Sequence, residues 1–296
     1  MDLDFELSAL AVQEGLPAPM VWRLLQHPVA RRRAALQRRD LTEEQIEEII
    51  ALGSARSLAA NRWVPASTKA RLAEHPEPAV RCAAAASATD EPPGLLARLA
   101  NDPEPLVRSF LTMNEHLPTE LLTRLAEDPN SSVREWIPQH CRNAPEAVRR
   151  ALFTDSEPGV RQAALAHWSP ALDLLPALLA DPVTRVAAAR RSPPTPELAR
   201  DPDPCVRSAV AAHPQLPAVL RDLLAEDPNV LVRNEIARRA DTPPVLRELL
   251  MSTLATEDPT ETFLLSHRSH TCPAPAAAPP VLTEEQAEAL LARAGL

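Results

Sequence analysis

Regularly spaced Asp-Pro pairs, a leucine-rich run after each pair and a scarcity of glycine predict an all-α solenoid of about ten two-helix repeats. Each repeat runs from an Asp-Pro or His-Pro pair through three residues to Val-Arg, then to a second proline and the leucine-rich run. Most copies begin about 26 residues after the preceding one, and a degenerate copy starts near Gly53. The recognisable starts are His27, His75, Asp102, Asp128, Asp155, Asp181, Asp201, Asp227 and Asp258.

Composition favours helices over a β-fold. The chain has 296 residues, of which 5 are glycine and 33 are proline, and only 3% are aromatic. A core made under these limits consists of Leu, Val and Ala, which suit closely packed helices better than a β-sandwich. A single globular core of this length would also be near its upper size limit, which favours a repeat array.

Each repeat is expected to contain two short helices. The Asp is a capping residue and the proline after it suits the first helical position, so the pair is expected to open the first helix. The second proline opens the other helix, whose apolar residues recur as pairs four residues apart, as in Val219-Leu220 with Leu223-Leu224.

Three parts are predicted along the chain: a capping half-repeat over 1–26, the regular solenoid over 27–251 and an atypical repeat over 252–296. The atypical repeat contains a Pro/Ala-rich loop over 271–281 and a second helix that starts with Leu-Thr-Glu-Glu-Gln at 282–286. The same five residues occur at 41–45, and both copies hold a capping box between threonine and glutamine. A shortened repeat over 181–200 has its second helix reduced to 196–200.

The pattern Asp-Pro-x-x-x-Val-Arg, a polar residue, proline and Leu-Leu-x-x-Leu-Ala resembles the leucine-rich repeat variant family, and more distantly the HEAT-like repeats, over residues 16–296. The resemblance implies a right-handed superhelix of short α- and 3₁₀-helices in alternation, and it implies no common activity. The four cysteines lie far apart without a Cys-x-x-Cys pair, so we predict no disulfide framework, metal centre or other cofactor.

An arginine recurs at the Val-Arg position of the repeats. Arginines in register suit phosphate binding, but bidentate pairing with carboxylates also suits an Asp–Arg ladder that ties neighbouring repeats together, as the HEAT-like repeats do. We predict the ladder, with interruptions at Ala187 and Leu264. Its arginines are Arg33, Arg81, Arg108, Arg134, Arg161, Arg207 and Arg233.

A second polar position recurs in the turn between the two helices of each repeat, and we call it the turn column. Its side chains either satisfy backbone groups at turns and helix ends, which we predict for most of them, or form a row that binds a partner. A metal between His140 and His167 is a minor alternative, and the set His267, His270 and Cys272 lacks a fourth ligand. The turn column comprises Arg39, Asn61, Ser87, Asn114, His140, His167, His213, Arg239 and His270, with Arg191 nearby.

Candidate partner contacts come from the turn column and from nearby tryptophans, because exposed aromatic side chains often mark interfaces. Trp63 and Trp168 lie at turns between helices, whereas Trp136 lies within a first helix and is assigned to the core. The candidate binding residues are Trp63, Trp168, His140, His167, His213, Arg191 and Arg239.

The sequence predicts a binding scaffold rather than an enzyme. Its five glycines form no phosphate loop or dinucleotide fingerprint, and neither a Gly-x-Ser-x-Gly nor a His-Glu-x-x-His motif occurs. We therefore expect a non-catalytic solenoid that binds another protein or a peptide. The N-terminus is acidic where a secretory signal is basic, and no apolar run is long enough to span a membrane, so a cytoplasmic protein is expected.

The alternative is a solenoid that binds nucleic acid through its arginines, similar in principle to HEAT-like repair glycosylases. The net charge of −9 counts against it, because phosphate binding depends on a basic surface. Residues 1–26 hold one arginine and four acidic residues, and residues 252–296 hold two and six, which leaves the middle of the chain almost neutral. The pattern makes no prediction of oligomeric state.

Overall fold

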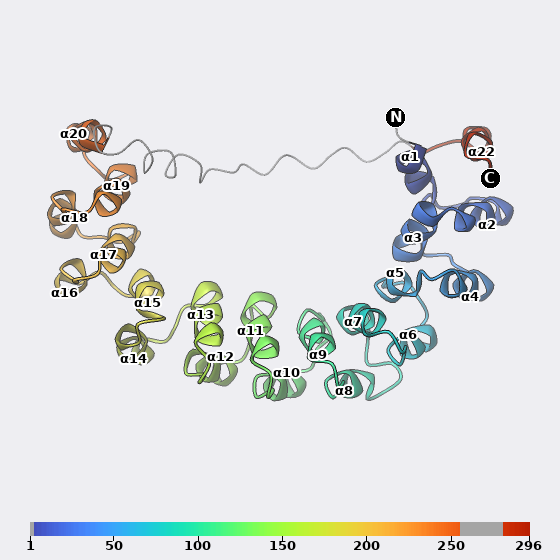
Figure 1. Cartoon of the computed structure of the whole chain (residues 1–296), viewed down its shortest axis with the longest axis horizontal. Coiled ribbons are helices and arrows are strands. Elements are labelled where there is room, and N and C mark those ends of the chain that lie inside the picture. The colour runs from blue at the N-terminus through green and yellow to red at the C-terminus, as the bar shows by residue number, and fades with distance from the viewer. Residues whose placement is uncertain (1–2, 255–280) are drawn as a thin grey trace. The chain divides into compact units, whose positions relative to one another are not determined.

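The computed structural model describes residues 3–254 and 281–296, and every regular element in these ranges is a helix (Figure 1). The chain is an all-α solenoid of stacked two-helix repeats, which confirms the predicted fold class. It divides into two compact units, which we call unit 1 (Met1–Ala144 and Ala276–Leu296) and unit 2 (Pro145–Pro275). This division differs from the three parts predicted from the sequence, and most of the predicted 271–281 loop lies outside the described residues.

Unit 1 has two layers of helices (Figure 1). The A layer consists of α1 (Leu3–Leu10), α3 (Pro28–Gln37), α5 (Ala55–Ala59), α7 (Pro78–Ser87), α9 (Pro105–Leu111) and α11 (Ser131–His140). The B layer consists of α22 (Glu284–Arg293), α2 (Ala18–Gln26), α4 (Glu43–Ala51), α6 (Ala66–Leu72), α8 (Leu95–Leu99) and α10 (Thr119–Leu125). Each A helix packs against the next A helix, so the A layer is a continuous row from α1 to α11.

Unit 2 also consists of a layer of A helices and a layer of B helices. Its A helices are α13 (Pro158–His167), α15 (Arg185–Arg191), α17 (Pro204–Ala211) and α19 (Val230–Arg238). Its B helices are α12 (Glu146–Phe153), α14 (Leu175–Ala180), α16 (Pro196–Ala199), α18 (Ala218–Ala225) and α20 (Pro244–Leu254). The four-residue α16 confirms the shortened repeat. Among the described residues η1 (Leu172–Leu174) is the one 3₁₀-helix, so the alternation implied by the family resemblance is not found.

Most A helices begin two residues later than the Asp-Pro pairs suggest. In the repeat that starts at Asp102, Glu104 is the N-cap residue and Pro105 occupies the first turn. The carboxylate of Asp102 instead accepts the backbone N–H of Glu104 at 2.9 Å, which forms a turn that leads into the helix. The prediction that the Asp caps the helix was therefore wrong, because the residue two positions after it is the N-cap: Glu104 before Pro105 in α9, and Asn130, whose side chain accepts the N–H of Ser132, in α11.

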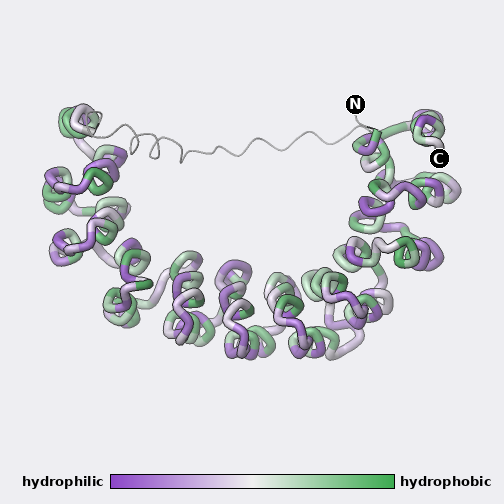
Figure 2. Tube along the Cα trace, viewed as in Figure 1, coloured by the Kyte–Doolittle hydropathy of each residue, from purple (hydrophilic) through white to green (hydrophobic). Residues whose placement is uncertain are grey.

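The core consists of Leu, Val and Ala side chains from both layers, as predicted. Hydrophobic and hydrophilic residues alternate along the helices (Figure 2), as expected where one side of each helix is buried. The predicted apolar pairs are buried only in part. In α18, Leu220 and Leu224 are 6% and 1% exposed, whereas Val219 is 80% exposed, because successive helical residues point about 100° apart.

The predicted Asp–Arg ladder is present in both units. Arg108 Nε and Nη2 donate to the two carboxylate oxygens of Asp128, in the next repeat, at 2.7 and 2.9 Å. Its Nη1 donates to the carbonyl oxygen of Asp102 at 2.6 Å, so one side chain ties its own repeat to the following one. Ion pairs of this kind include Arg81–Asp102 and Arg108–Asp128 in unit 1, and Arg161–Asp181 and Arg207–Asp227 in unit 2.

Two positions of the ladder differ from the prediction. Arg31, rather than Arg33, donates to the carbonyl of Leu25 and to Ser54 Oγ, because Pro28 corresponds to the helix-opening proline and not to the Asp-Pro proline. The sequence predicts an interruption at Ala187, but Arg185 pairs with the buried Asp201 and continues the ladder there.

Helix α22 packs against α1 and α2 at the N-terminal end of unit 1 (Figure 1), rather than completing the last repeat of unit 2. The side chain of Gln13 donates to the carbonyl of Leu282 at 2.7 Å and accepts its N–H at 2.9 Å. Arg23 pairs with Glu288 at 2.7 Å. The capping box predicted for this helix is present, but the helix extends the B layer beyond α2.

Candidate functional site

Several side chains of the turn column bond to the backbone of the preceding repeat. The amide nitrogen of Asn114 donates to the carbonyls of Ala85 and Ala88 at 2.6 and 2.8 Å, and its oxygen accepts the N–H of His116 at 2.8 Å. Asn61 makes the equivalent three bonds in its own turn. These bonds satisfy carbonyls at the end of an A helix, as the structural interpretation of the column predicts.

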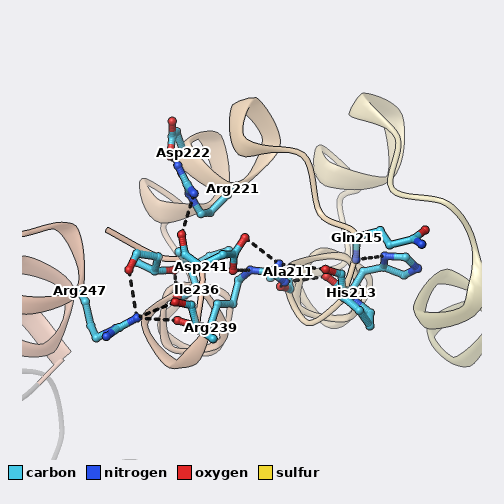
Figure 3. A network of polar contacts seen from close by, with 12 residues as sticks. Ala211, His213, Gln215, Arg221, Asp222, Ile236, Arg239, Asp241 and Arg247 are labelled. Atoms are coloured by element: carbon cyan, nitrogen blue, oxygen red, sulfur yellow. Dashed lines mark hydrogen bonds and ion pairs between the residues drawn. The ribbon is translucent and has the colours of Figure 1, made fainter. Parts of the chain in front are cut away.

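Arginine fills the same role in some other turns. Figure 3 shows Arg239 reaching the preceding turn, where Nη1 donates to the carbonyls of Ala211 and His213 at 2.9 and 2.6 Å. Its Nε also donates to Asp241 at 2.8 Å. In unit 1 the buried Arg38 contacts the preceding turn in the same manner and lies 2.7 Å from Asp40. The turn column therefore contains Arg38 rather than the predicted Arg39.

Figure 3 also shows how two other arginines support the turn after α19. Arg247 donates to the carbonyl of Arg239 at 2.9 Å, and Arg221 donates to the carbonyl of Asp241 at 2.9 Å. In the shortened repeat, Arg191 donates to the carbonyls of Ala166 and Trp168 at 3.0 and 3.3 Å. Arg191 and Arg239 thus carry structural bonds that a partner would have to replace.

The predicted partner contacts are divided between the two units. Trp63 and His140 belong to unit 1, and the other five candidates belong to unit 2. Trp63 is 49% exposed and has the guanidinium of Arg39 4.4 Å from its ring centroid. Trp168 is 4% exposed, so the expectation that this ring is available at the surface was wrong.

The three histidine candidates have different surroundings. His140 and His167 are exposed, and the ring of His140 lies 5.2 Å from that of Trp136. His213 is half-buried and its Nδ1 accepts the N–H of Gln215 at 3.1 Å. Burial, with a smaller effect from the charge of Arg239, lowers the pKa of His213, so its neutral form is favoured. Within the described ranges, no three potential metal-ligating side chains come together.

Lys69 is a feature that the sequence analysis did not assign. It is the single lysine of the chain and is 4% exposed in the B layer of unit 1. Its Nζ donates to the carbonyls of Ala59 and Asn61 and to Ser87 Oγ, the last two at 2.8 and 2.7 Å. Burial without a carboxylate partner lowers the pKa of Lys69 from 10.5 to about 8.

Lys69 should therefore give the protein an unusual dependence of stability on pH. Between about pH 8 and 10.5 the unfolded chain holds a proton that the folded chain has lost, so stability rises with pH across this window, by about 3 kcal/mol in total. Urea unfolding of the wild type and of Lys69→Met from pH 7 to 10.5 measures the effect as a difference between the two proteins. That difference cancels the opposing contribution of Cys141, whose pKa burial raises to about 11. Parallel pH profiles would contradict the assignment.

A groove of about 1160 Å³ lies over α3, α5, α7 and α9 in the A layer of unit 1. Its floor consists of small residues on α5 and α7, among them Ala55, Ala79, Ala83 and Ala86. Helix α5 has 5 residues where α3 and α7 have 10 each, so the degenerate repeat covers less of this face than its neighbours do. A short helix and alanine side chains together account for the hollow.

Large apolar side chains form the wall at α9. Leu106 and Met113 are 52% and 44% exposed; Leu106 and Phe110 share one face of α9, and Met113 lies in the turn after the helix. The ring of Phe110 is 5.2 Å from that of Trp136 on α11, which extends the apolar surface by one helix. This end of the groove therefore offers aromatic and aliphatic contacts that no described side chain covers.

Arginines line the opposite end, at α3 and α5. Arg32, Arg56 and Arg62 border the groove and are exposed. In the described part of the chain, the side chains of Arg56 and Arg62 make neither a hydrogen bond nor an ion pair, and that of Arg32 makes only a 3.4 Å bond to the carbonyl of Pro28. Several exposed arginines elsewhere in unit 1 are paired with carboxylates, as in Arg98 with Glu74 at 2.7 Å.

The groove is visible in the sequence as a change of side-chain size between neighbouring repeats, not as a group of reactive residues. Ala79, Ala83 and Ala86 each lie 27 residues before a large apolar residue at the same position of the next repeat, Leu106, Phe110 and Met113 respectively. None of the seven predicted contacts lines the groove.

Comparison with known proteins adds no family assignment: no protein-family model matches the chain, and no match is found among curated proteins. In the described ranges, none of the helices has the length and apolar character needed to cross a bilayer.

Proposed function

We propose that this chain is a non-catalytic solenoid that binds a peptide segment of another protein, and that the groove of unit 1 is the binding site. The observation that carries the proposal is the combination of an alanine floor with exposed Leu106 and Met113 and with arginines that lack partners among the described residues. Concave sites with apolar walls and a few polar groups are the usual form of ligand sites.

The geometry suits a chain segment better than a compact small molecule. The groove extends across four consecutive A helices, α3, α5, α7 and α9, which pack in that order. Helices stack at roughly 8–10 Å, so the groove is roughly 24–30 Å long from first axis to last. An extended peptide of about eight residues spans that length.

Selection from a library of random linear peptides tests the proposal. The full-length protein is the bait, and the affinity of each enriched peptide is then measured by fluorescence anisotropy. Ala83→Phe fills the hollow with a side chain, and we expect it to weaken binding at least about tenfold. Thr123→Phe, at an exposed position of α10 outside the groove, is the matched control and should bind as the wild type does.

Circular dichroism and thermal unfolding of both variants establish that each remains folded. Peptides that bind wild type and Ala83→Phe equally well would overturn the assignment of the groove. A selection that enriches no peptide would overturn the proposal itself.

A further inference from the structure

We infer that the groove takes an acidic peptide in which carboxylates precede or follow a large apolar side chain at a fixed spacing. This inference rests on the proposed function and specifies the chemistry of the ligand. It is carried by the separation of charge and apolar surface along the groove.

The charge of the groove favours an acidic ligand. Arg32, Arg56 and Arg62 form a cationic group around α3 and α5 in a chain whose net charge is −9. Several arginines of the ladder and of the B layer are neutralised by neighbouring carboxylates, as in Arg81–Asp102 and Arg71–Glu47. The groove arginines are not neutralised within the described residues, so a carboxylate ligand gains charge-assisted hydrogen bonds without displacing an internal partner.

Acidic residues in the lining disfavour a ligand that is anionic along its whole length. Glu77, before α7, and Glu115, after α9, also line the groove. Glu115 lies 3.8 Å from His116, and both side chains are exposed. These carboxylates repel the phosphate groups of a ligand. At the α9 end, the groove is lined by Leu106, Phe110 and Met113, which offer no positive charge to a phosphate. A nucleic-acid strand carries charge at each nucleotide, whereas a peptide can be acidic at one end and apolar at the other.

The distance between the arginines and the apolar wall sets the spacing of the two groups in the ligand. Helix α5, which carries Arg56, is followed in the A layer by α7 and then by α9, which carries the apolar wall. Two helix steps correspond to roughly 16–20 Å. An extended chain covers that distance with about five or six residues, so the acidic group and the apolar anchor of the ligand should be separated by about that number.

Synthetic fluorescein-labelled peptides test the inference with the full-length chain. The first probe has three glutamates, a neutral linker of about five residues and a Leu-Phe pair. A second probe places the glutamates directly beside the Leu-Phe pair, a third replaces the glutamates with lysines, and a fourth is a single-stranded DNA oligonucleotide. We expect the first probe to bind at least about tenfold more tightly than the other three at low salt.

Charge reversal in the protein supplies the second measurement. Arg56→Glu with Arg62→Glu should weaken the first probe at least about tenfold and should favour the lysine probe instead. Arg142→Glu is the matched control, since Arg142 is exposed and lies outside the groove, and it should leave the order of affinities unchanged. A gain for the lysine probe is a result that unfolding of the variant cannot produce.

The outcomes separate this inference from the proposed function. If library peptides lose affinity with Ala83→Phe but bind the double arginine variant as well as wild type, the acidic chemistry is overturned and the groove remains a peptide site. Tighter binding of the DNA probe than of the first peptide would overturn the inference in favour of nucleic acid.

Discussion

A chain that ends at Pro280 should lose about 5 kcal/mol of the stability of unit 1, because it lacks α22. Leu290 and Leu291 of α22 are 3% and 0% exposed, and they cover the end of the core that contains Leu7 and Leu10. Loss of two buried leucines and of the Arg23–Glu288 ion pair accounts for the effect, most of it apolar. Guanidinium unfolding followed by circular dichroism should show an earlier transition for the truncated chain than for the full chain.

Two point variants distinguish the loss of packing from other effects of truncation. Leu291→Ala should reproduce about half of the destabilisation, since it leaves a cavity at a fully buried position. Glu288→Gln removes only an exposed ion pair and should cost less than about 1 kcal/mol. Identical unfolding midpoints for the full and truncated chains would show that α22 does not stabilise unit 1.

The position of α22 illustrates what repeat periodicity predicts and what it leaves open. The Leu-Thr-Glu-Glu-Gln sequence at 282–286 identifies a B helix with a capping box, and both features are present. Every B helix has the same kind of apolar stripe, however, so the pattern does not specify which end of the array the helix completes. Contacts between residues far apart in sequence, such as Gln13 with Leu282, decide that question.

The location of the candidate site also depends on how helices pack and not on the repeat pattern alone. Selection of polar and aromatic residues at the turns identified side chains such as Arg239, which bond to carbonyls of the preceding turn. The groove arises instead from small residues, at Ala79 and Ala83, and from a shortened helix. Polar, charged and aromatic residues in the sequence do not indicate a hollow, because a hollow forms where side chains are small.

Replacement of Arg108 by methionine should destabilise unit 1 by about 3–5 kcal/mol, because it leaves the carboxylate of Asp128 buried without its partner. Burial alone would raise the pKa of Asp128, but hydrogen bonds from Arg108 and from the N–H of Asn130 outweigh it and hold the pKa below its ordinary value. The double variant Arg108→Met with Asp128→Asn should recover part of the loss, since no unpaired charge remains. Denaturant unfolding of the four proteins measures the coupling, and additive losses would contradict it.

The pH dependence of the same cycle provides a second check on the ladder. Because the pKa of Asp128 is lowered in the folded state, its contribution to stability is present above the ordinary carboxylate pKa and is lost as pH falls through the lower, folded-state value. The stabilities of wild type and Arg108→Met should therefore converge in acid and differ most at neutral pH. Arg185→Met should cost less than Arg108→Met, because the side chain of Arg185 is 38% exposed and that of Arg108 is 12% exposed. Equal losses at the two positions would mean that burial of the arginine does not govern the strength of the ladder.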